Sequence, residues 1–158
     1  MFGPMTASPY TPDPYHSLPA PHRQPQFYDG VAVKRLIAWF IDAVAVVLLS
    51  AVVGLLTLTL AFWVWPVTIV VISWLYRVGT ISAASATPGM RLMGIEFRDG
   101  RGDRFTGGQA IVHTTAYMIA TTIVIAQIIS IILMVGTRQG QALHDLLLGS
   151  TAINTPID

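Results

Sequence analysis

An apolar run from Leu36 to Leu58 constrains the fold more than any other feature of this sequence. Its roughly 23 residues exceed the ~20 that an α-helix needs to cross the hydrocarbon core of a bilayer. A second apolar run extends from Phe62 to Ala84. Only 11% of the residues are charged, whereas soluble domains contain about 25%, so the chain cannot cover a globule in water. We therefore predict an all-α integral membrane protein in contact with the lipid bilayer.

A third apolar segment, from Ala110 to Val135, is harder to place. At about 1.5 Å per residue it is long enough for one crossing but not for two. One crossing would separate the C-terminal residues from the loop that precedes the segment, whereas a bent or re-entrant segment would return them to the same side. We expect one crossing, which gives about three transmembrane helices in all.

The N-terminal 30 residues differ in composition from the rest, because they hold seven of the ten prolines. Such a segment buries too little apolar surface to order itself, and we expect a flexible, disordered tail over residues 1–30. The alternative is a strap that orders on a partner, with aromatic anchors at Tyr10, Tyr15, Phe27 and Tyr28. The transmembrane domain then covers residues 31–152, and residues 153–158 form a short C-terminal tail.

A polar loop over residues 88–107 joins the second and third apolar segments. Within it, "MGIEF" and "RFT" flank "RDGRGD", whose Asp-Gly and Gly-Asp pairs supply turn conformations, so we expect a short hairpin. We interpret "TPG" at 87–89 as a helix stop, because Pro88 disfavours a helical conformation at the residue before it.

The distribution of Lys and Arg predicts the orientation in the membrane. Cations precede the first span and follow the second, and none lies between the two spans. Because short cytoplasmic loops are enriched in Lys and Arg, we expect the N-terminus and the 88–107 loop in the cytoplasm. The cations concerned are Arg23, Lys34, Arg35, Arg91, Arg98, Arg101 and Arg104.

One carboxylate, Asp42, lies inside the first apolar run and needs a partner. An unpaired charge there costs on the order of 2.5–3.5 kcal/mol. Arg35 is on the same helical face, two turns away, but its side chain leans toward the headgroups, so a pair within the helix is disfavoured. Arg77 in the antiparallel second span lies at a matching depth, and we predict an Asp42–Arg77 contact. The alternatives are that Arg77 extends to the headgroups and that Asp42 is protonated or pairs with Arg138 or His144.

The third apolar segment carries a polar stripe, with His113, Tyr117 and Thr121 four residues apart and Gln127 nearly in line. Inside a bilayer such groups usually bridge helices, which we favour over a proton relay through His113. Further on, His144 and Asp145 are adjacent. We interpret them as a polar anchor or cap of a short helix at the membrane surface.

Motifs of common enzymes and cofactor sites are missing from the sequence: there is no Walker loop, G-x-G-x-x-G, H-E-x-x-H or G-x-S-x-G. With no cysteine, a thiolate metal site is excluded. No basic block indicates a nucleic-acid partner. We therefore predict neither an enzyme nor a cofactor or metal.

Three blocks together resemble the RDD family of small bacterial membrane proteins: "RLIAWFID" (Arg35 to Asp42), "TPGMRLMGI" (Thr87 to Ile95) and "RQGQALHDLLLGST" (Arg138 to Thr151). The resemblance covers about residues 31–152 and equates the family's arginine and two aspartates with Arg35, Asp42 and Asp145. It differs at Met90, where the family usually has lysine; Arg91 is the neighbouring cation. It implies a multi-pass protein of the bacterial inner membrane. For some members of the family, transport resembling sodium–proton exchange has been suggested.

Two functions follow as hypotheses. The small size, the small-residue helix faces and the Pro-rich tail favour an accessory or assembly subunit that packs against a larger membrane complex. The alternative is an ion- or proton-coupled transport protein acting as a homo-oligomer, because ionisable residues within spans are functional candidates. The candidate residues for either role are Arg35, Asp42, Arg77, His144 and Asp145, followed by Arg91, His113 and Arg138.

Overall fold

The computed structural model describes residues 18–156, and these are mostly helical. Helices α1 (Val31–Leu56) and α3 (Trp65–Ala84) are each long and apolar enough to cross a membrane. A bent pair of helices, α5 and α6, passes the same test only when the two are taken together. The predicted all-α membrane class is confirmed.

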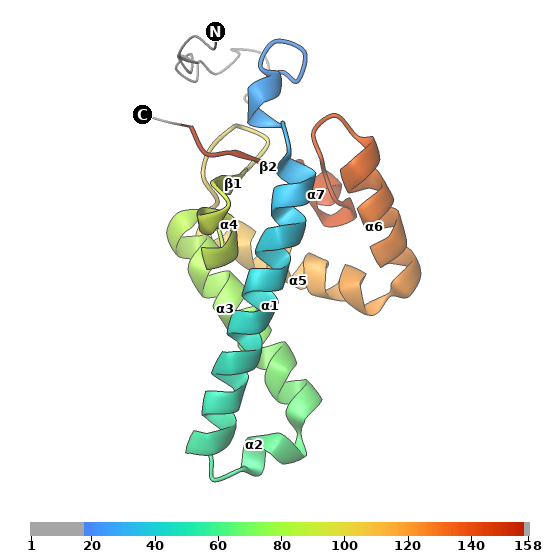
Figure 1. The fold of residues 1–158 in the computed structure, drawn as a ribbon. Coiled ribbons are helices and arrows are strands. Elements are labelled where there is room, and N and C mark those ends of the chain that lie inside the picture. The colour runs from blue at the N-terminus through green and yellow to red at the C-terminus, as the bar shows by residue number, and fades with distance from the viewer. Residues whose placement is uncertain (1–17, 157–158) are drawn as a thin grey trace, which may run out of the picture.

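The two spans form an antiparallel hairpin joined by the short helix α2 (Leu60–Trp63). The second span begins at Trp65 rather than at Phe62, with Pro66 in its first turn, where a missing N–H costs nothing. The Phe62 ring lies against Gly54, and a Cβ on Gly54 would come within 2.5 Å of it. In Figure 1 no other labelled element accompanies this end of the hairpin.

The third apolar segment is broken rather than straight. Helices α5 (Gly107–Thr122) and α6 (Val124–Gly136) meet at Ile123 with a 115° bend. The hydroxyls of Thr121 and Thr122 bond to carbonyls four residues back, a local competition that often bends helices. Beyond the bend, α6 runs back toward the end of the molecule where α7 and the sheet lie (Figure 1).

Both ends of the bent segment lie at the same end of the α1–α3 hairpin. Before α5, the Phe105 N–H donates to Ser85 Oγ (2.7 Å), just after the end of α3. After α6, Arg35 near the start of α1 donates to the Gly140 carbonyl (3.0 Å). The predicted single crossing is therefore wrong, because the chain returns to the side from which α5 began. Length alone could not indicate this bend.

The predicted hairpin is also wrong. Strand β1 (Ile95–Arg98) pairs antiparallel with β2 (Thr151–Asn154), not with "RFT", and Phe97 lies opposite Ala152. The intervening turn is closed by the Asp99 carboxylate, which accepts from the Arg101 and Asp103 N–H groups. The sheet thus joins distant parts of the chain, and β2 extends past residue 152 to Asn154.

Part of the N-terminal segment is ordered. A 3₁₀ turn, η1 (Pro25–Phe27), buries Phe27, and Asn154 Nδ2 donates to the carbonyls of Gln26 (2.8 Å) and Asp29 (3.0 Å). The segment around η1 therefore contacts β2, so this part of the predicted flexible tail is held against the fold. The rest of that tail, with Tyr10 and Tyr15, lies outside the described residues.

We call the start of α1, the sheet, α4 (Pro88–Leu92) and α7 (Leu143–Leu148) the polar end. The buried core gathers there, around Ile95, Phe97 and Phe105. Elsewhere α1 buries a stripe of residues four apart, and most of its other large apolar side chains are exposed, as in a helix that faces lipid. The stripe consists of Ala38, Asp42, Val46, Ser50 and Gly54.

Candidate functional site

The ion pair between Arg35 and Asp145 is the centre of the polar end. The Arg35 guanidinium lies 2.5 Å from Asp145 Oδ2, and the aspartate side chain is fully buried. The same oxygen accepts from the Ala142 N–H (2.9 Å) at the start of α7, where the helix dipole favours an acidic side chain. Asp145 therefore caps α7 and binds α1 at once. The predicted cap is present, and it buries Asp145 and His144 while Leu146 and Leu147 of the same helix are exposed.

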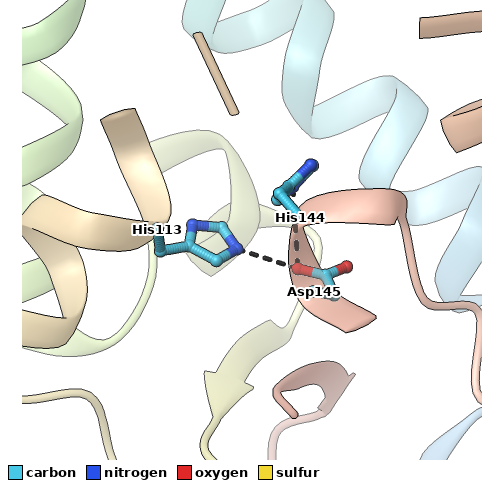
Figure 2. Close-up of side chains that lie close together, drawn as sticks. All are labelled: His113, His144 and Asp145. Carbon is cyan, nitrogen blue, oxygen red and sulfur yellow. Dashed lines mark hydrogen bonds and ion pairs between the residues drawn. The ribbon is translucent and has the colours of Figure 1, made fainter. Parts of the chain in front are cut away.

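Two histidines face the other oxygen of Asp145 (Figure 2). His113 Nε2 on α5 lies 2.8 Å from Oδ1, and His144 Nε2 lies 3.6 Å from it. The His113–Asp145 hydrogen bond places the hydrogen on Nε2, so an uncharged His113 has an accepting lone pair at Nδ1. The Nδ1 atoms of both rings are buried and have no partner among the described residues.

Two groups on α7 have shifted pKa values. Burial alone raises the pKa of Asp145, but the Arg35 guanidinium and the hydrogen bond from His113 outweigh it and hold that pKa well below its usual range. Burial lowers the pKa of His144 to about 3, despite the neighbouring Asp145 carboxylate. At neutral pH the aspartate is therefore ionised and His144 is uncharged.

The buried, uncharged His144 predicts a loss of stability in acid. The pKa of His144 is about 3 in the folded chain and 6.5 in the unfolded chain. At a pH between these two pKa values the unfolded chain binds the proton and the folded chain does not. The contribution of His144 to the free energy of unfolding should be greatest above about pH 6.5 and should decrease as the pH drops toward 3. Thermal unfolding in mild detergent from about pH 7 to about pH 5 measures this. His144→Gln should flatten the dependence; equal acid sensitivity in both proteins would contradict the account.

Asp42 is held by three hydrogen-bond donors. Its carboxylate accepts from the hydroxyls of Tyr76 (2.8 Å) and Thr87 (2.5 Å) and from the Gly89 N–H (2.9 Å). Glycine is required at position 89, since a Cβ there would lie 2.4 Å from the Ala38 carbonyl oxygen. The partners are all neutral, and together they satisfy a buried carboxylate.

The predicted Asp42–Arg77 contact is therefore wrong. No ion pair joins them in residues 18–156, and Asp42 pairs with neither Arg138 nor His144. The prediction matched depths along two helices but missed Thr87 and Gly89, which α4 brings beside α1. The signal was available in "TPG", because threonine before proline is a common helix N-cap, and Thr87 is the N-cap of α4.

Arg77 instead packs on an aromatic ring. Its guanidinium lies 4.6 Å from the Tyr117 ring centroid, and its Nε is buried without a partner among the described residues. The Tyr117 hydroxyl accepts from Trp39 Nε1 (2.9 Å), so the polar stripe of α5 does bridge helices as predicted. Two other predicted residues lie apart: Arg91 is exposed, and exposed Arg138 contacts His22 (2.6 Å).

Replacing Arg77 by methionine should change the free energy of unfolding by less than about 1 kcal/mol, or raise it. The lost cation–π contact is offset because the substitution also removes a partly buried positive charge that has no acidic partner in residues 18–156. Thermal unfolding and the yield of folded protein in detergent measure the effect. A loss of more than about 2 kcal/mol would indicate an acidic partner after all.

A cavity of about 260 Å³ lies between α1, α3, α5 and α6. It is bordered by the side chains of Arg35, Asp42, Arg77, His113 and His144, together with the hydroxyls of Thr114 and Ser130 and the amide of Gln127. One wall is apolar, formed by Leu36, Ile131 and Met134. Sequence reasoning missed Ser130 and Thr114 because their inward positions depend on the bend at Ile123.

Three donor atoms in this region converge as metal ligands would. His113 Nε2, His144 Nε2 and an Asp145 oxygen lie within 4.8 Å of one another, and all three residues are buried. However, Arg35 holds the second oxygen of Asp145, and neither Nδ1 has the acceptor that usually orients a metal-bound histidine. The cluster therefore fits a hydrogen-bonded relay better than a cation site.

The comparison with protein families identifies the chain. A model described as the RDD family matches residues 30–149. The chain belongs to the RDD family. No curated protein and no solved structure matches it. The family resemblance drawn from three sequence blocks is thereby confirmed.

The contacts explain why the three RDD blocks occur together. Asp42 of the first block binds Thr87 and Gly89 of the second. Arg35 of the first block binds Asp145 of the third. The first helix of this RDD protein thus holds the other two blocks through charged side chains, at one end of the molecule. Met90, which replaces the family's usual lysine, is buried beside the cavity.

Proposed function

We propose that this RDD protein is a non-enzymatic, transport-related membrane protein that binds a small solute in its cavity. The observation that supports this is the cavity of about 260 Å³ bordered by ionisable side chains. Charged groups in a membrane domain are costly, and they usually mark pathways or binding sites. These side chains are Arg35, Asp42, Arg77, His113 and His144.

Unsatisfied polar atoms strengthen the proposal. The buried atoms without partners among the described residues all belong to residues that border the cavity. Buried polar atoms are satisfied in most proteins, so several exceptions around one cavity indicate an occupant. They are Arg77 Nε, His113 Nδ1, His144 Nδ1 and Thr114 Oγ1.

Two long helices and one re-entrant pair enclose too little space for a complete path across the bilayer. We therefore propose that the protein works as a homo-oligomer. We place it in the bacterial inner membrane, as membership of the RDD family suggests, and the cation distribution favours the polar end in the cytoplasm.

Proton flux into proteoliposomes tests the function. Liposomes containing a pH-sensitive dye and the full chain should show proton flux when a pH gradient or a membrane potential is imposed. His113→Gln, which keeps a donor to Asp145 but cannot accept a proton, should abolish it, whereas Arg91→Gln at an exposed site should not. Thermal unfolding establishes that each variant is folded. Flux no greater than in empty liposomes, or full activity in His113→Gln, would argue against transport.

An accessory or assembly role is the second proposal, and one observation favours it. The end of the hairpin farthest from the sheet contains only α1, α2 and α3, which leaves apolar faces free for another membrane subunit (Figure 1). Native mass spectrometry of the protein extracted from its own membrane tests this. A partner present at a fixed ratio would support the accessory role, and a homo-oligomer would support transport.

A further inference from the structure

The charges around the cavity are unevenly balanced. The Arg35 charge is compensated by Asp145 at 2.5 Å. The Asp42 charge is stabilised by three neutral donors. Arg77 alone among these has no compensating group: none of the ion pairs within residues 18–156 includes it. A cation in this position favours an anionic ligand, because the ligand would supply the missing charge.

The remaining partnerless atoms define what else the ligand should offer. His113 donates to Asp145 from Nε2, so its Nδ1 is an acceptor when the ring is uncharged. His113, His144 and Thr114 are at most 5% exposed, and all three border the cavity. They can bind a hydroxyl, an amide or a water that accompanies the anion.

The apolar wall sets the shape of the ligand. Leu36, Ile131 and Met134 border the same cavity as the charged groups. A bare inorganic ion would leave this wall in contact with water, whereas a ligand with an apolar body would cover it. A metal cation is disfavoured, because two arginines border the same cavity.

We propose that the cavity binds an organic oxyanion, whose carboxylate or phosphate head contacts Arg77 and whose short apolar body lies against Leu36, Ile131 and Met134. The proposal rests on the proposed function in taking this cavity as the solute site. The same chemistry occurs in free organic acids and in the headgroups of anionic lipids, and the test separates these two sources.

The experiment uses the full chain in nanodiscs of phosphatidylcholine, with thermal unfolding as the readout. Benzoate is the probe, and benzamide is its uncharged analogue of the same shape. Benzoate should raise the unfolding temperature saturably, and benzamide should need at least about tenfold higher concentration, because charge-assisted hydrogen bonds are the stronger ones. Arg77→Gln should remove the difference between the probes. Arg91→Gln, which changes an exposed arginine, should keep it.

A second arm replaces part of the phosphatidylcholine with phosphatidic acid and omits benzoate. An Arg77-dependent rise in unfolding temperature there, with no benzoate effect in the first arm, would identify a lipid headgroup as the occupant. A benzoate effect without a lipid effect would identify a free organic acid. Both outcomes support the oxyanion site.

The proposal is overturned if benzoate and benzamide act alike and phosphatidic acid has no Arg77-dependent effect, or if Arg77→Gln binds as the wild type does. Because Arg77 has no acidic partner to lose, Arg77→Gln should fold and give an interpretable result. Binding without flux in proteoliposomes would remove the transport function and keep the site. Flux without binding would keep the transport function and remove the oxyanion site.

Discussion

Replacing Asp145 by asparagine should destabilise the protein by about 3–5 kcal/mol, the usual cost of removing one member of a buried ion pair. The substitution leaves the Arg35 guanidinium buried without a counter-charge, since its other described contacts are the Gly140 carbonyl and the Phe97 ring. It also weakens the cap on the Ala142 N–H at the start of α7. Thermal and denaturant unfolding in mild detergent measure the loss.

A matched control is available in the loop after β1. Asp103 is exposed, and Asp103→Asn should change stability by less than about 0.5 kcal/mol. The double variant Arg35→Met with Asp145→Asn should lose less than the two single losses together, because the pair is removed as a unit. Additive losses, or a mild effect of Asp145→Asn, would show that the ion pair does not form.

The second large effect is expected at Asp42, where the outcome depends on whether the new side chain can still accept hydrogen bonds. Asp42→Ala leaves three donors without an acceptor, and we expect a loss of about 3–4 kcal/mol, given about 1–3 kcal/mol for each unsatisfied buried group and partial relaxation. Asp42→Asn should cost less than half as much. Its amide oxygen can still accept from Tyr76 and Gly89, while its NH₂ group can donate to the Thr87 hydroxyl.

The contrast between alanine and asparagine separates two roles for Asp42. A structural acceptor tolerates asparagine, whereas a carboxylate that carries a proton or an ion does not. Stability and proteoliposome flux should be measured on the same preparations. If Asp42→Asn is stable but loses flux completely, Asp42 acts in transport; if it is as unstable as Asp42→Ala, the charge itself holds α4 on α1.

Much of the architecture was predictable, because hydrophobic length decides it. The runs ending at Leu58 and Ala84 became α1 and α3 within a few residues. Arg35, Asp42 and Asp145 were all recognised as important, since charged residues in an apolar chain are few. Their burial in the structure follows from the same rule.

The pairing of these residues was not predictable from the sequence. Depth matching joined Asp42 to Arg77, yet the carboxylate is satisfied by neutral groups. One is the Tyr76 hydroxyl of α3, and the other two, Thr87 and Gly89, are at the start of α4, a short helix that hydropathy does not detect. The partner of Arg35 depends on the bend at Ile123, which returns α7 to the start of α1. Hydrogen bonds from the Thr121 and Thr122 hydroxyls to backbone carbonyls accompany this bend. The periodicity of apolar residues does not indicate such bonds.

The sheet illustrates the same limit. "MGIEF" was recognised as a strand, but its partner was sought nearby, since turn residues follow it. The observed partner, Thr151–Asn154, lies more than fifty residues away. Only the return of α6 brings this segment within reach, so the hairpin and the single crossing were wrong for one reason.

The central claim is that α5 and α6 return the chain to the side of the membrane from which α5 starts, so that Asp145 can meet Arg35. Single cysteines at Thr155, Arg101 and Leu58, all exposed, test it directly in a chain that has no other cysteine. Sealed vesicles of known orientation are treated with a membrane-impermeant maleimide. The account predicts that Thr155→Cys and Arg101→Cys react from one side and Leu58→Cys from the other. Reaction of Thr155→Cys from the same side as Leu58→Cys would contradict it.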